Sequence, residues 1–238
     1  MTRIAVLVPA FNEEANIKSV VRELRQHARG VEVIVIDDGS WDATAERART
    51  AGARVIQLPF NTGIGATVQT GLRVALALGH ELVVRIDGDG QHDSRDLDRL
   101  LTPIERGEAD FVLGSRHLAD GGFRTTLPRR LGIRWFSFLL RTFCGLRITD
   151  PTSGFWAANP RAARLLLAES ASDYPEVDSL VYLSRRGCCI EERPVTMRPR
   201  GAGRSSIEGL HTLYYMLKVS VALLAGRLRR RTPREDPR

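Results

Sequence analysis

Cysteine, lysine and long apolar runs are all scarce in this chain of 238 residues. The three cysteines, two of them adjacent (Cys188 and Cys189), fit neither a disulfide framework nor a zinc-binding spacing. The apolar start of the chain lacks the pattern of a secretory signal. The mostly apolar segment 209–226 carries His211 and Lys218 and is short for a membrane span of about 20 residues. We therefore expect a cytoplasmic protein without a transmembrane helix.

Lysine is so rare that arginine supplies nearly all of the positive charge. Lys18 and Lys218 are the only lysines among 35 basic residues, and 28 acidic residues leave a net charge of +7. Residues 1–115 hold 13 basic and 17 acidic groups, a net −4, whereas residues 116–238 hold 22 and 11, a net +11. We therefore expect the two halves of the chain to bind different partners.

Two glycine-rich phosphate-binding motifs are missing as well. The first apolar run is not followed by G-x-G-x-x-G, and G-x-x-x-x-G-K-[ST] does not occur, which disfavours a dinucleotide-binding fold and a P-loop. If the protein binds phosphate, metal and arginine are the expected ligands.

The first 115 residues repeat an apolar run, a turn and an amphipathic stretch. The runs predict strands over 4–8, 31–36, 53–58, 82–86 and 110–113. The stretches between them predict helices over 14–28, 42–51, 65–78 and 94–105, with Asp42 and Ser94 as N-caps. Strands that are apolar on both faces and alternate with helices indicate a mostly parallel sheet flanked by helices. We predict an α/β fold whose ligand lies beyond the carboxyl ends of the strands.

Polar clusters follow three of these strands, at 9–14 (Pro-Ala-Phe-Asn-Glu-Glu), 37–40 (Asp-Asp-Gly-Ser) and 87–92 (Asp-Gly-Asp-Gly-Gln-His). Carboxylates gathered at one edge repel one another unless a cation or hydrogen-bond donors offset their charge. Asp87, Asp89 and Gln91 can each offer an oxygen ligand, which Mg²⁺ or Mn²⁺ prefers. These ligands do not fill the coordination shell of the cation, so water and phosphate oxygens must supply the rest. The pattern predicts a divalent cation with a diphosphate, although the 37–40 segment taken alone also fits a plain turn.

Further motifs occur at 61–65 (Asn-Thr-Gly-Ile-Gly), 114–116 (Gly-Ser-Arg), 150–155 (Asp-Pro-Thr-Ser-Gly-Phe) and 176–178 (Glu-Val-Asp). In this order, and over residues 3–205, the chain resembles the family-2 glycosyltransferases, specifically the branch of dolichyl- and polyprenyl-phosphate sugar synthases. The resemblance implies a GT-A-like α/β fold. It also implies an inverting, metal-dependent hexosyltransferase that moves a sugar from a nucleotide-diphosphate sugar, a UDP- or GDP-sugar, to a polyprenyl phosphate.

The resemblance implies residue roles too. Nucleotide-binding residues would be Pro9, Phe11, Glu13, Asp38, Asp87 and Gly88, and the Mg²⁺ or Mn²⁺ ligands would be Asp89 and Gln91. Asp89, Asp178 and Arg116 would be catalytic, with Asp178 or Glu176 as the base for a hydroxyl acceptor, whereas an anionic lipid phosphate needs no strong base. The acceptor and phosphate ligands would be Arg116, Arg130, Arg134, Ser137, Arg200 and Arg204.

Two segments of the basic half have an amphipathic, arginine-flanked pattern. Residues 131–146 predict a helix that is either buried or in contact with a membrane. The tail predicts a C-terminal amphipathic helix on the membrane surface, with core packing or a dimer contact as the alternative. We thus divide the chain into a nucleotide-sugar-binding half (1–115), an acceptor-binding half of the same domain (116–208) and a basic membrane-associating tail (209–238).

The expected location is cytoplasmic, peripheral at the inner face of the membrane. The expected partners are the nucleotide sugar, a lipid-phosphate acceptor and the membrane surface, with a membrane partner protein or a homo-oligomer left open and nucleic acid not expected. Three alternatives remain: a glycosyltransferase with a glycan hydroxyl acceptor, a sugar nucleotidyltransferase, and a non-enzymatic peripheral membrane protein. The sequence does not choose the sugar or the nucleotide.

Overall fold

The computed structural model describes residues 2–27, 30–118, 127–169 and 175–198. The predicted phosphate ligands Arg200 and Arg204 and the predicted amphipathic tail 209–238 lie outside these ranges. In the part that is described, no helix has both the length and the apolar character needed to cross a membrane.

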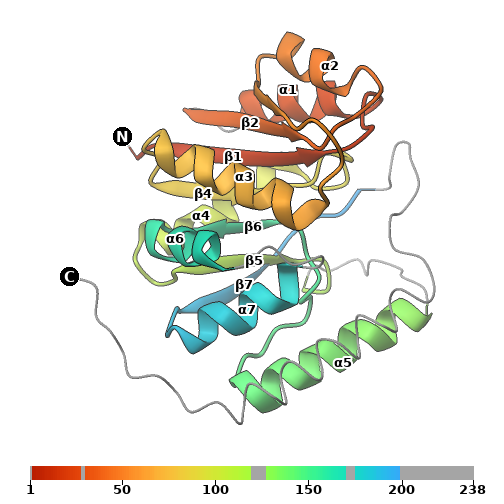
Figure 1. The fold of residues 1–238 in the computed structure, drawn as a ribbon. Helices are drawn as coiled ribbons and strands as arrows, with labels where there is room; N and C mark the ends of the chain where they lie inside the picture. Colours follow the sequence, from red (N-terminus) through yellow and green to blue (C-terminus); the bar gives the residue numbers. More distant parts are fainter. Residues whose placement is uncertain (1, 28–29, 119–126, 170–174, 199–238) are drawn as a thin grey trace.

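A single sheet of seven strands runs through the described residues (Figure 1). Its strands are β1 (Ile4–Ala10), β2 (Val31–Asp37), β3 (Arg54–Gln57), β4 (Leu82–Arg85), β5 (Phe111–Ser115), β6 (Trp156–Ala158) and β7 (Ile190–Pro194). They are arranged in the order β3-β2-β1-β4-β6-β5-β7. Only β6 is antiparallel to its neighbours, β4 and β5. Both sequence halves contribute strands to this sheet, and the predicted mostly parallel sheet is confirmed.

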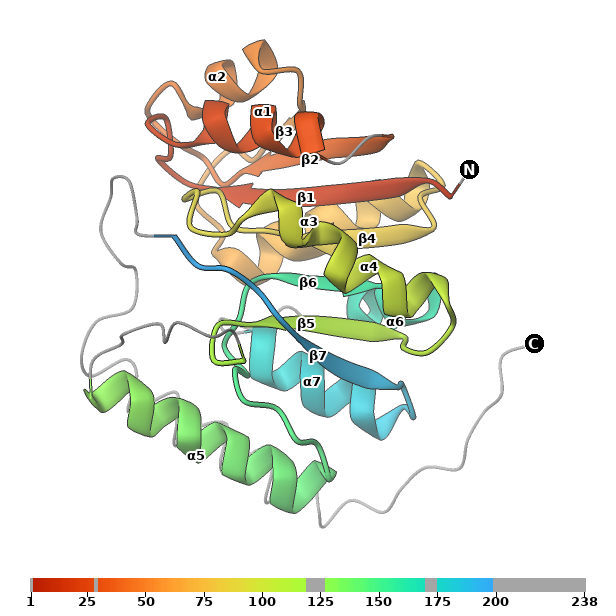
Figure 2. The same cartoon turned by 180° about the vertical axis from the view of Figure 1, so that it is seen from behind.

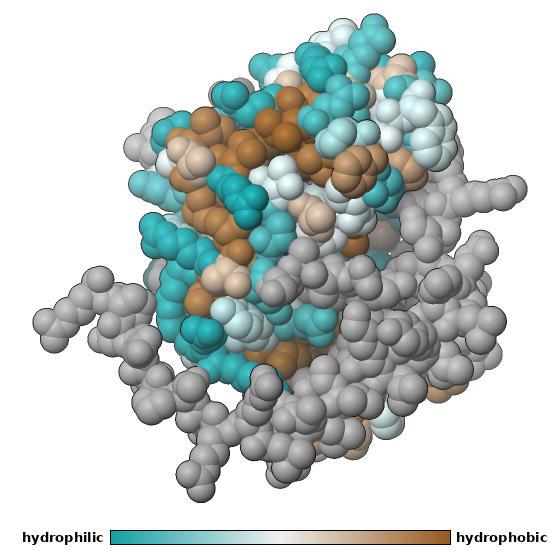
Figure 3. Space-filling model, viewed as in Figure 1, coloured by the Kyte–Doolittle hydropathy of each residue, from teal (hydrophilic) through white to brown (hydrophobic). Residues whose placement is uncertain are grey.

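Helices cover both faces of the sheet and bury most residues of β1, β2, β4, β5 and β6, whereas the outer strands β3 and β7 are less buried. One core joins the sheet to α3 (Ile64–Ala77), α5 (Leu127–Cys144), α6 (Pro160–Ala168) and α7 (Pro175–Arg185). The other joins it to α1 (Ile17–His27), α2 (Thr44–Thr50) and α4 (Leu97–Glu105), seen in Figure 2. α5 lies beyond α7, at the end of the molecule away from β3 (Figures 1 and 2). Half-buried side chains of α3 add apolar surface to the first face (Figure 3).

Each predicted strand and helix of residues 1–115 is present, but the two helix starts differ in detail. Asp42 lies one residue before the N-cap of α2, Ala43, and its Oδ1 accepts a hydrogen bond from the Thr44 N–H at 2.9 Å. The prediction of Ser94 as an N-cap is wrong. Asp93 caps the short 3₁₀ turn at Ser94–Asp96 that leads into α4, because its carboxylate reaches the Arg95 N–H at 3.0 Å.

Candidate active site

The carboxyl ends of β2, β1 and β4 lie side by side, on the right-hand side of Figure 1. The chain leaves β1 through α1 on one face of the sheet, and it reaches β4 after α3 on the other face. A crevice between strands whose connections diverge in this way is where open α/β sheets bind ligands. The structure thus brings the three polar clusters of the sequence to one edge, as predicted.

The loop after β1 is fastened to the loop after β2. The Asn12 N–H donates to Ser40 Oγ (2.9 Å), and the Trp41 N–H donates to Asn12 Oδ1 (3.2 Å). Asn12 has a φ of 54°, a left-handed conformation that asparagine tolerates better than most residues. The ring of Phe11, 36% exposed, meets Trp41 edge to face with centroids 5.0 Å apart. These rings give the rim of the edge an apolar surface on which a nucleotide base can pack.

Glu13 and Pro9 lie on either side of this rim. The Glu13 carbonyl accepts the first hydrogen bonds of α1, from the N–H groups of Asn16 (3.0 Å) and Ile17 (2.9 Å), and its carboxylate accepts from Asn16 Nδ2 (2.7 Å). Pro9 lies in β1, and its carbonyl oxygen would be only 3.0 Å from a Cβ placed on Gly88. Glycine at position 88 therefore lets the loop after β4 pass close to the end of β1.

Asp38 holds a neighbouring loop in place, which the sequence did not predict. Its Oδ1 accepts from the N–H and the hydroxyl of Thr62, both at 2.7 Å, and its Oδ2 accepts from the Gly63 N–H at 2.9 Å. The predicted role of Asp38 in nucleotide binding stays a prediction. The adjacent Asp37 is fully buried, and its Oδ2 has no hydrogen-bond partner among the described residues, which leaves one acceptor unsatisfied at this edge.

Asp87 is enclosed by three groups. Its Oδ1 accepts from Arg85 Nη2 (3.1 Å), its Oδ2 lies 3.7 Å from His92 Nε2, and a Cβ on Gly154 would lie 2.4 Å from Oδ2. Burial by itself would raise the pKa of Asp87, but the charge of Arg85, with His92 beside it, holds that pKa well below its usual range. Asp87 is therefore ionised at neutral pH.

The two predicted metal ligands lie just beyond Asp87. Asp89 is buried and accepts the Gln91 N–H at 3.0 Å, and the backbone of Gln91 accepts the Arg198 N–H at 2.7 Å. Within the described ranges, no three His, Cys, Asp or Glu side chains are grouped so that they could hold a metal. The donor set fits a hard cation such as Mg²⁺ or Mn²⁺ only if water and a diphosphate supply the other oxygen atoms.

Arg116, predicted to bind phosphate, forms a buried ion pair with Asp150 of the 150–155 motif. Its Nε and Nη2 each lie 2.6 Å from a carboxylate oxygen, and Nη2 also lies 3.2 Å from Thr152 Oγ1. Removing one partner of such a pair costs about 3–5 kcal/mol. Burial by itself would lower the pKa of Arg116, but the hydrogen bond and charge of Asp150, with the charges of Asp87 and Asp89, raise it. A phosphate contact of Arg116 stays a prediction.

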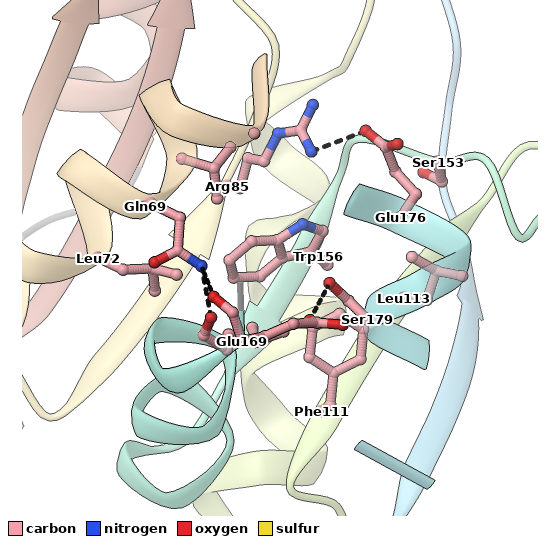
Figure 4. Close-up of a pocket in the computed structure, with 13 residues that line it drawn as sticks. Gln69, Leu72, Arg85, Phe111, Leu113, Ser153, Trp156, Glu169, Glu176 and Ser179 are labelled. Carbon is pink, nitrogen blue, oxygen red and sulfur yellow. Dashed lines mark hydrogen bonds and ion pairs between the residues drawn. The ribbon is translucent and has the colours of Figure 1, made fainter. Parts of the chain in front are cut away.

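The first turn of α7 carries Glu176 and Asp178, but they point to different sides, since residues two apart lie about 200° apart around a helix. Glu176 Oε1 accepts from Arg85 Nη1 at 2.9 Å (Figure 4). The charge of Asp178 instead acts on Glu169, whose pKa is raised to about 7, mainly by burial. The structure thus turns Glu176, and not Asp178, toward β4, and the role of Asp178 as a base stays a prediction.

Below the Arg85–Glu176 pair, a cavity of about 30 Å³ lies between the sheet and helices α3, α6 and α7 (Figure 4). Its polar wall includes Gln69, whose amide donates to the Glu169 carbonyl at 3.0 Å, and Ser179, which donates to Glu169 Oε2 at 3.0 Å. A space of this size has room for one or two water molecules and is too small for a sugar.

The remaining predicted phosphate ligands lie on α5. Arg130 and Arg134 are exposed, whereas Ser137 is half-buried and donates to the Ile133 carbonyl at 2.9 Å. The alternative of a buried helix describes one side of this helix, and the alternative of a membrane contact stays a prediction. Phe136 and Leu140 are buried, while an exposed stripe runs through Leu131, Trp135 and Phe138, which are 61%, 42% and 56% exposed.

Two residues of this edge were missed by reasoning from the sequence. Arg85 interrupts the apolar run of β4, which was the available signal. Arg198 donates to Glu23 (2.8 Å) and lies 3.1 Å from Asp93. The sequence around Arg198 does not predict these partners. Arg198 and Arg85 each have a partner far away in the sequence, which for Arg85 is Glu176.

Several characterised proteins align with most of this chain. An undecaprenyl-phosphate mannosyltransferase of Micrococcus luteus is 32% identical, with 87% of this chain and 88% of that protein covered. A polyprenol monophosphomannose synthase of Mycolicibacterium smegmatis is 30% identical, with 96% and 89% covered. A UDP-N-acetylglucosamine–dolichyl-phosphate N-acetylglucosaminyltransferase of Methanococcus voltae is 27% identical, with 92% and 96% covered.

Among solved structures, glucosyl-3-phosphoglycerate synthase of Mycobacterium tuberculosis, crystallised with Mn²⁺, UDP and glucosyl-3-phosphoglycerate, superposes with a TM-score of 0.71. It is 27% identical, with 95% of this chain and 80% of that chain covered. This similarity confirms the GT-A-like α/β fold. The family model for glycosyl transferase family 2 matches residues 5–166, which include all three polar clusters of the edge. This chain therefore belongs to glycosyl transferase family 2 and is a glycosyltransferase.

Proposed function

We propose that this glycosyltransferase moves a sugar from a UDP- or GDP-sugar to a polyprenyl phosphate, by a metal-dependent single displacement that inverts the anomeric carbon. The observation that carries the proposal is the set of relatives named for transfer to undecaprenyl, polyprenol or dolichyl phosphate, each aligned over at least 87% of this chain. The non-enzymatic alternative is set aside by membership of the family.

The strand-end edge supports binding of the donor. Phe11, 36% exposed, offers an apolar ring on which the base can pack. Asp89 and Gln91 would hold the divalent cation, and Asp87 stays ionised beside them. The cation, when bound, neutralises charge that develops on the departing diphosphate.

The acceptor chemistry decides whether a base is needed. A lipid phosphate already carries an anionic oxygen near neutral pH, so that alignment behind the anomeric carbon is the main requirement. The exposed Arg130 and Arg134 on α5 are placed to attract such a phosphate, since a guanidinium matches its oxygens in bidentate geometry. Glu176 is already paired with Arg85, which supports a mechanism that does not use Glu176 as the base.

α5 also supports a membrane-bound acceptor. Leu131, Trp135 and Phe138 recur at helical spacing on its exposed side, and the Trp135 and Phe138 rings lie 6.1 Å apart. An apolar stripe flanked by arginines is typical of a helix lying in a membrane interface with anionic headgroups. The enzyme would thus act from the inner face of the membrane, peripherally bound, where the prenyl chain is held.

The structural neighbour favours one second candidate, which is transfer to the hydroxyl of a water-soluble phosphorylated acid. That neighbour is crystallised with glucosyl-3-phosphoglycerate and, in another complex, with phosphoglyceric acid. A hydroxyl acceptor requires a base, for which Asp178 is the candidate. A glycan hydroxyl would make the same demand.

A donor and acceptor screen distinguishes these functions. The protein is incubated with Mn²⁺ or Mg²⁺, labelled UDP- and GDP-sugars, and either polyprenyl phosphate in detergent, phosphoglyceric acid or a glycan. We expect a labelled, organic-extractable product whose mass equals glycosylated polyprenyl phosphate. Label found only in water-soluble products from the other acceptors would refute transfer to the lipid.

Removal of the proposed metal ligand tests the donor site directly. We expect Asp89→Ala to lower transfer by at least about 100-fold, because a phosphate clamp of this kind contributes several kcal/mol to the transition state. We also expect it to abolish the Mn²⁺-dependent rise in melting temperature caused by UDP or GDP. Asp98→Ala, on the exposed side of α4, is the matched control. Unchanged turnover in a folded Asp89→Ala protein would refute the assignment.

A further inference from the structure

Arg85 is the only charged residue of β4, and its side chain points into the first core. It is 3% exposed and lines the same cavity as Leu72, Phe111 and Trp156 (Figure 4). A buried charge is costly unless opposite charges and hydrogen bonds offset it. Packing alone does not explain a charged residue at this buried position, because an apolar side chain could fill it.

The guanidinium of Arg85 divides its two terminal nitrogens between two carboxylates. Nη2 donates to Asp87 Oδ1 at 3.1 Å, and Nη1 donates to Glu176 Oε1 at 2.9 Å. Asp87 belongs to the strand-end edge. Glu176 lies in the first turn of α7, 91 residues further along the chain than Arg85. One cation thus joins the nucleotide edge to the helix that bears Asp178.

Other paired arginines among the described residues make different connections. Arg198 also divides its terminal nitrogens between two carboxylates, Glu23 of α1 (2.8 Å) and Asp93 before α4 (3.1 Å), and does not reach α7. Arg116 places both of its short contacts on the single carboxylate of Asp150. Arg161, on α6, pairs with Asp110 at 3.3 Å at the opposite end of β5. Among these four arginines, Arg85 is the one that joins the end of β4 to α7.

We propose, building on the proposed function, that Arg85 is a positioning residue for sugar transfer. By holding Asp87 and Glu176 at once, it sets the first turn of α7 at a fixed place relative to the bound nucleotide. Alignment of acceptor and donor within about 1 Å decides rates by roughly 100-fold in enzymes. A lysine at this position presents one compact charge and lacks the fork that reaches both carboxylates.

Steady-state kinetics test this link when donor and acceptor are varied separately. Glu176→Gln keeps the shape of the side chain and leaves Asp87 paired with Arg85. We expect it to lower kcat by about 10- to 100-fold while the donor KM changes less than about threefold. We expect Arg85→Lys to lower kcat by a similar factor. The kcat of the double variant should be no lower than that of the less active single variant, because both changes break the same connection.

Hydrogen exchange supplies a readout that does not depend on the acceptor. In the wild-type protein, Mn²⁺ with UDP or GDP is expected to slow amide exchange in α7, because the nucleotide edge and α7 are joined through Arg85. In Glu176→Gln, nucleotide affinity is expected to persist while this protection of α7 is lost. Arg161→Lys, which alters a pair outside the edge, is expected to behave as wild type in both experiments.

These outcomes separate the inference from the proposed function. A wild-type protein that binds nucleotide and protects α7, yet transfers nothing to polyprenyl phosphate, would refute the proposed acceptor and leave Arg85 as the link. Kinetic losses that multiply in the double variant would refute the link, as would an α7 whose exchange does not respond to nucleotide. A fall in melting temperature without a selective fall in kcat would reduce Arg85 to a structural role.

Discussion

The carboxylate of Asp87 is fixed by groups from three separate parts of the chain. Arg85 reaches it from β4, His92 approaches from the loop beyond, and the backbone of Gly154 lies against it. His92 is itself buried and tilts over the ring of Phe155 with centroids 5.1 Å apart. The 150–155 segment therefore has two contacts with the strand-end edge. Gly154 lies against the Asp87 carboxylate, and Asp150 pairs with Arg116.

Gly154 gives the first prediction at this scale. A Cβ at this position would lie 2.4 Å from Asp87 Oδ2 and 2.6 Å from Oδ1, so that Gly154→Ala must displace the carboxylate. We expect kcat/KM for the nucleotide sugar to fall by about 10- to 100-fold, since small displacements of positioning groups have effects of this size. Initial rates at varied donor concentration measure this.

Gly71→Ala is the matched control for that change. Its new Cβ would also be crowded, at 2.9 Å from Ile36 Cδ1, but by the flexible end of an apolar side chain in the core below α3. It is expected to alter the melting temperature while leaving the donor KM unchanged. Equal donor kinetics for Gly154→Ala and wild type would show that Asp87 tolerates displacement.

Single residues of the edge were predictable from the sequence to different degrees. Asp87 and Asp89 follow an apolar run directly, and strand ends converge by topology, so their clustering needed only the order of elements. The bonds of Asp38 to Thr62 and Gly63, and the pairing of Arg116 with Asp150, join loops 24 and 34 residues apart. Such contacts depend on how loops fold back, which local pattern does not encode.

At the scale of elements, the junction of α3, α6 and α7 contains a carboxyl group, that of Glu169, whose pKa lies well above its ordinary value. Burial, with Asp178 nearby, raises the pKa of Glu169 to about 7 from the ordinary value of 4.5. Ser179 faces it from α7, and Gln69 of α3 holds its backbone. Between about pH 4.5 and 7 the folded protein therefore keeps a proton that the unfolded chain has lost.

Stability should consequently fall as pH rises through this window, because the unfolded state binds fewer protons than the folded state. The full shift corresponds to about 3 kcal/mol, and we expect about 1–2 kcal/mol because the residue is only half-buried. Glu169→Gln should remove this decline and be more stable than wild type at pH 8 but not at pH 4. Urea unfolding at both pH values measures the difference, and parallel pH profiles for the two proteins would contradict it.

α5 shows what an element-scale pattern leaves open. The 131–146 segment is apolar around most of its circumference, so the sequence predicted the helix but not which side meets the protein. Packing against α7 decides this, since Phe136 and Leu140 are buried while Leu131, Trp135 and Phe138 stay exposed. The helix itself was predictable from periodicity, and its orientation required the position of α7.

At the scale of the whole molecule, the acidic and basic halves of the sequence both contribute strands to one sheet. Residues 1–115, net −4, contribute the strand-end carboxylates. Residues 116–238, net +11, contribute β6, β7 and the arginine-bearing α5. Because β6 lies between β4 and β5, the acidic and basic halves share one core and stay in a fixed relation.

This arrangement predicts how the protein docks on a lipid surface. Partial insertion of Trp135 and Phe138 removes apolar area from water, at about 25 cal/mol per Å², while Arg130 and Arg134 add about 1 kcal/mol each near anionic headgroups. We expect Trp135→Ser/Phe138→Ser to weaken co-sedimentation with phosphatidylglycerol vesicles at least about fivefold, and added salt to weaken wild-type binding through screening. Trp41→Ser, at the β2 end and 80% exposed, is the control. Unchanged vesicle binding by the α5 variant would refute α5 as the docking surface, because the two substitutions remove the exposed aromatic rings of that helix.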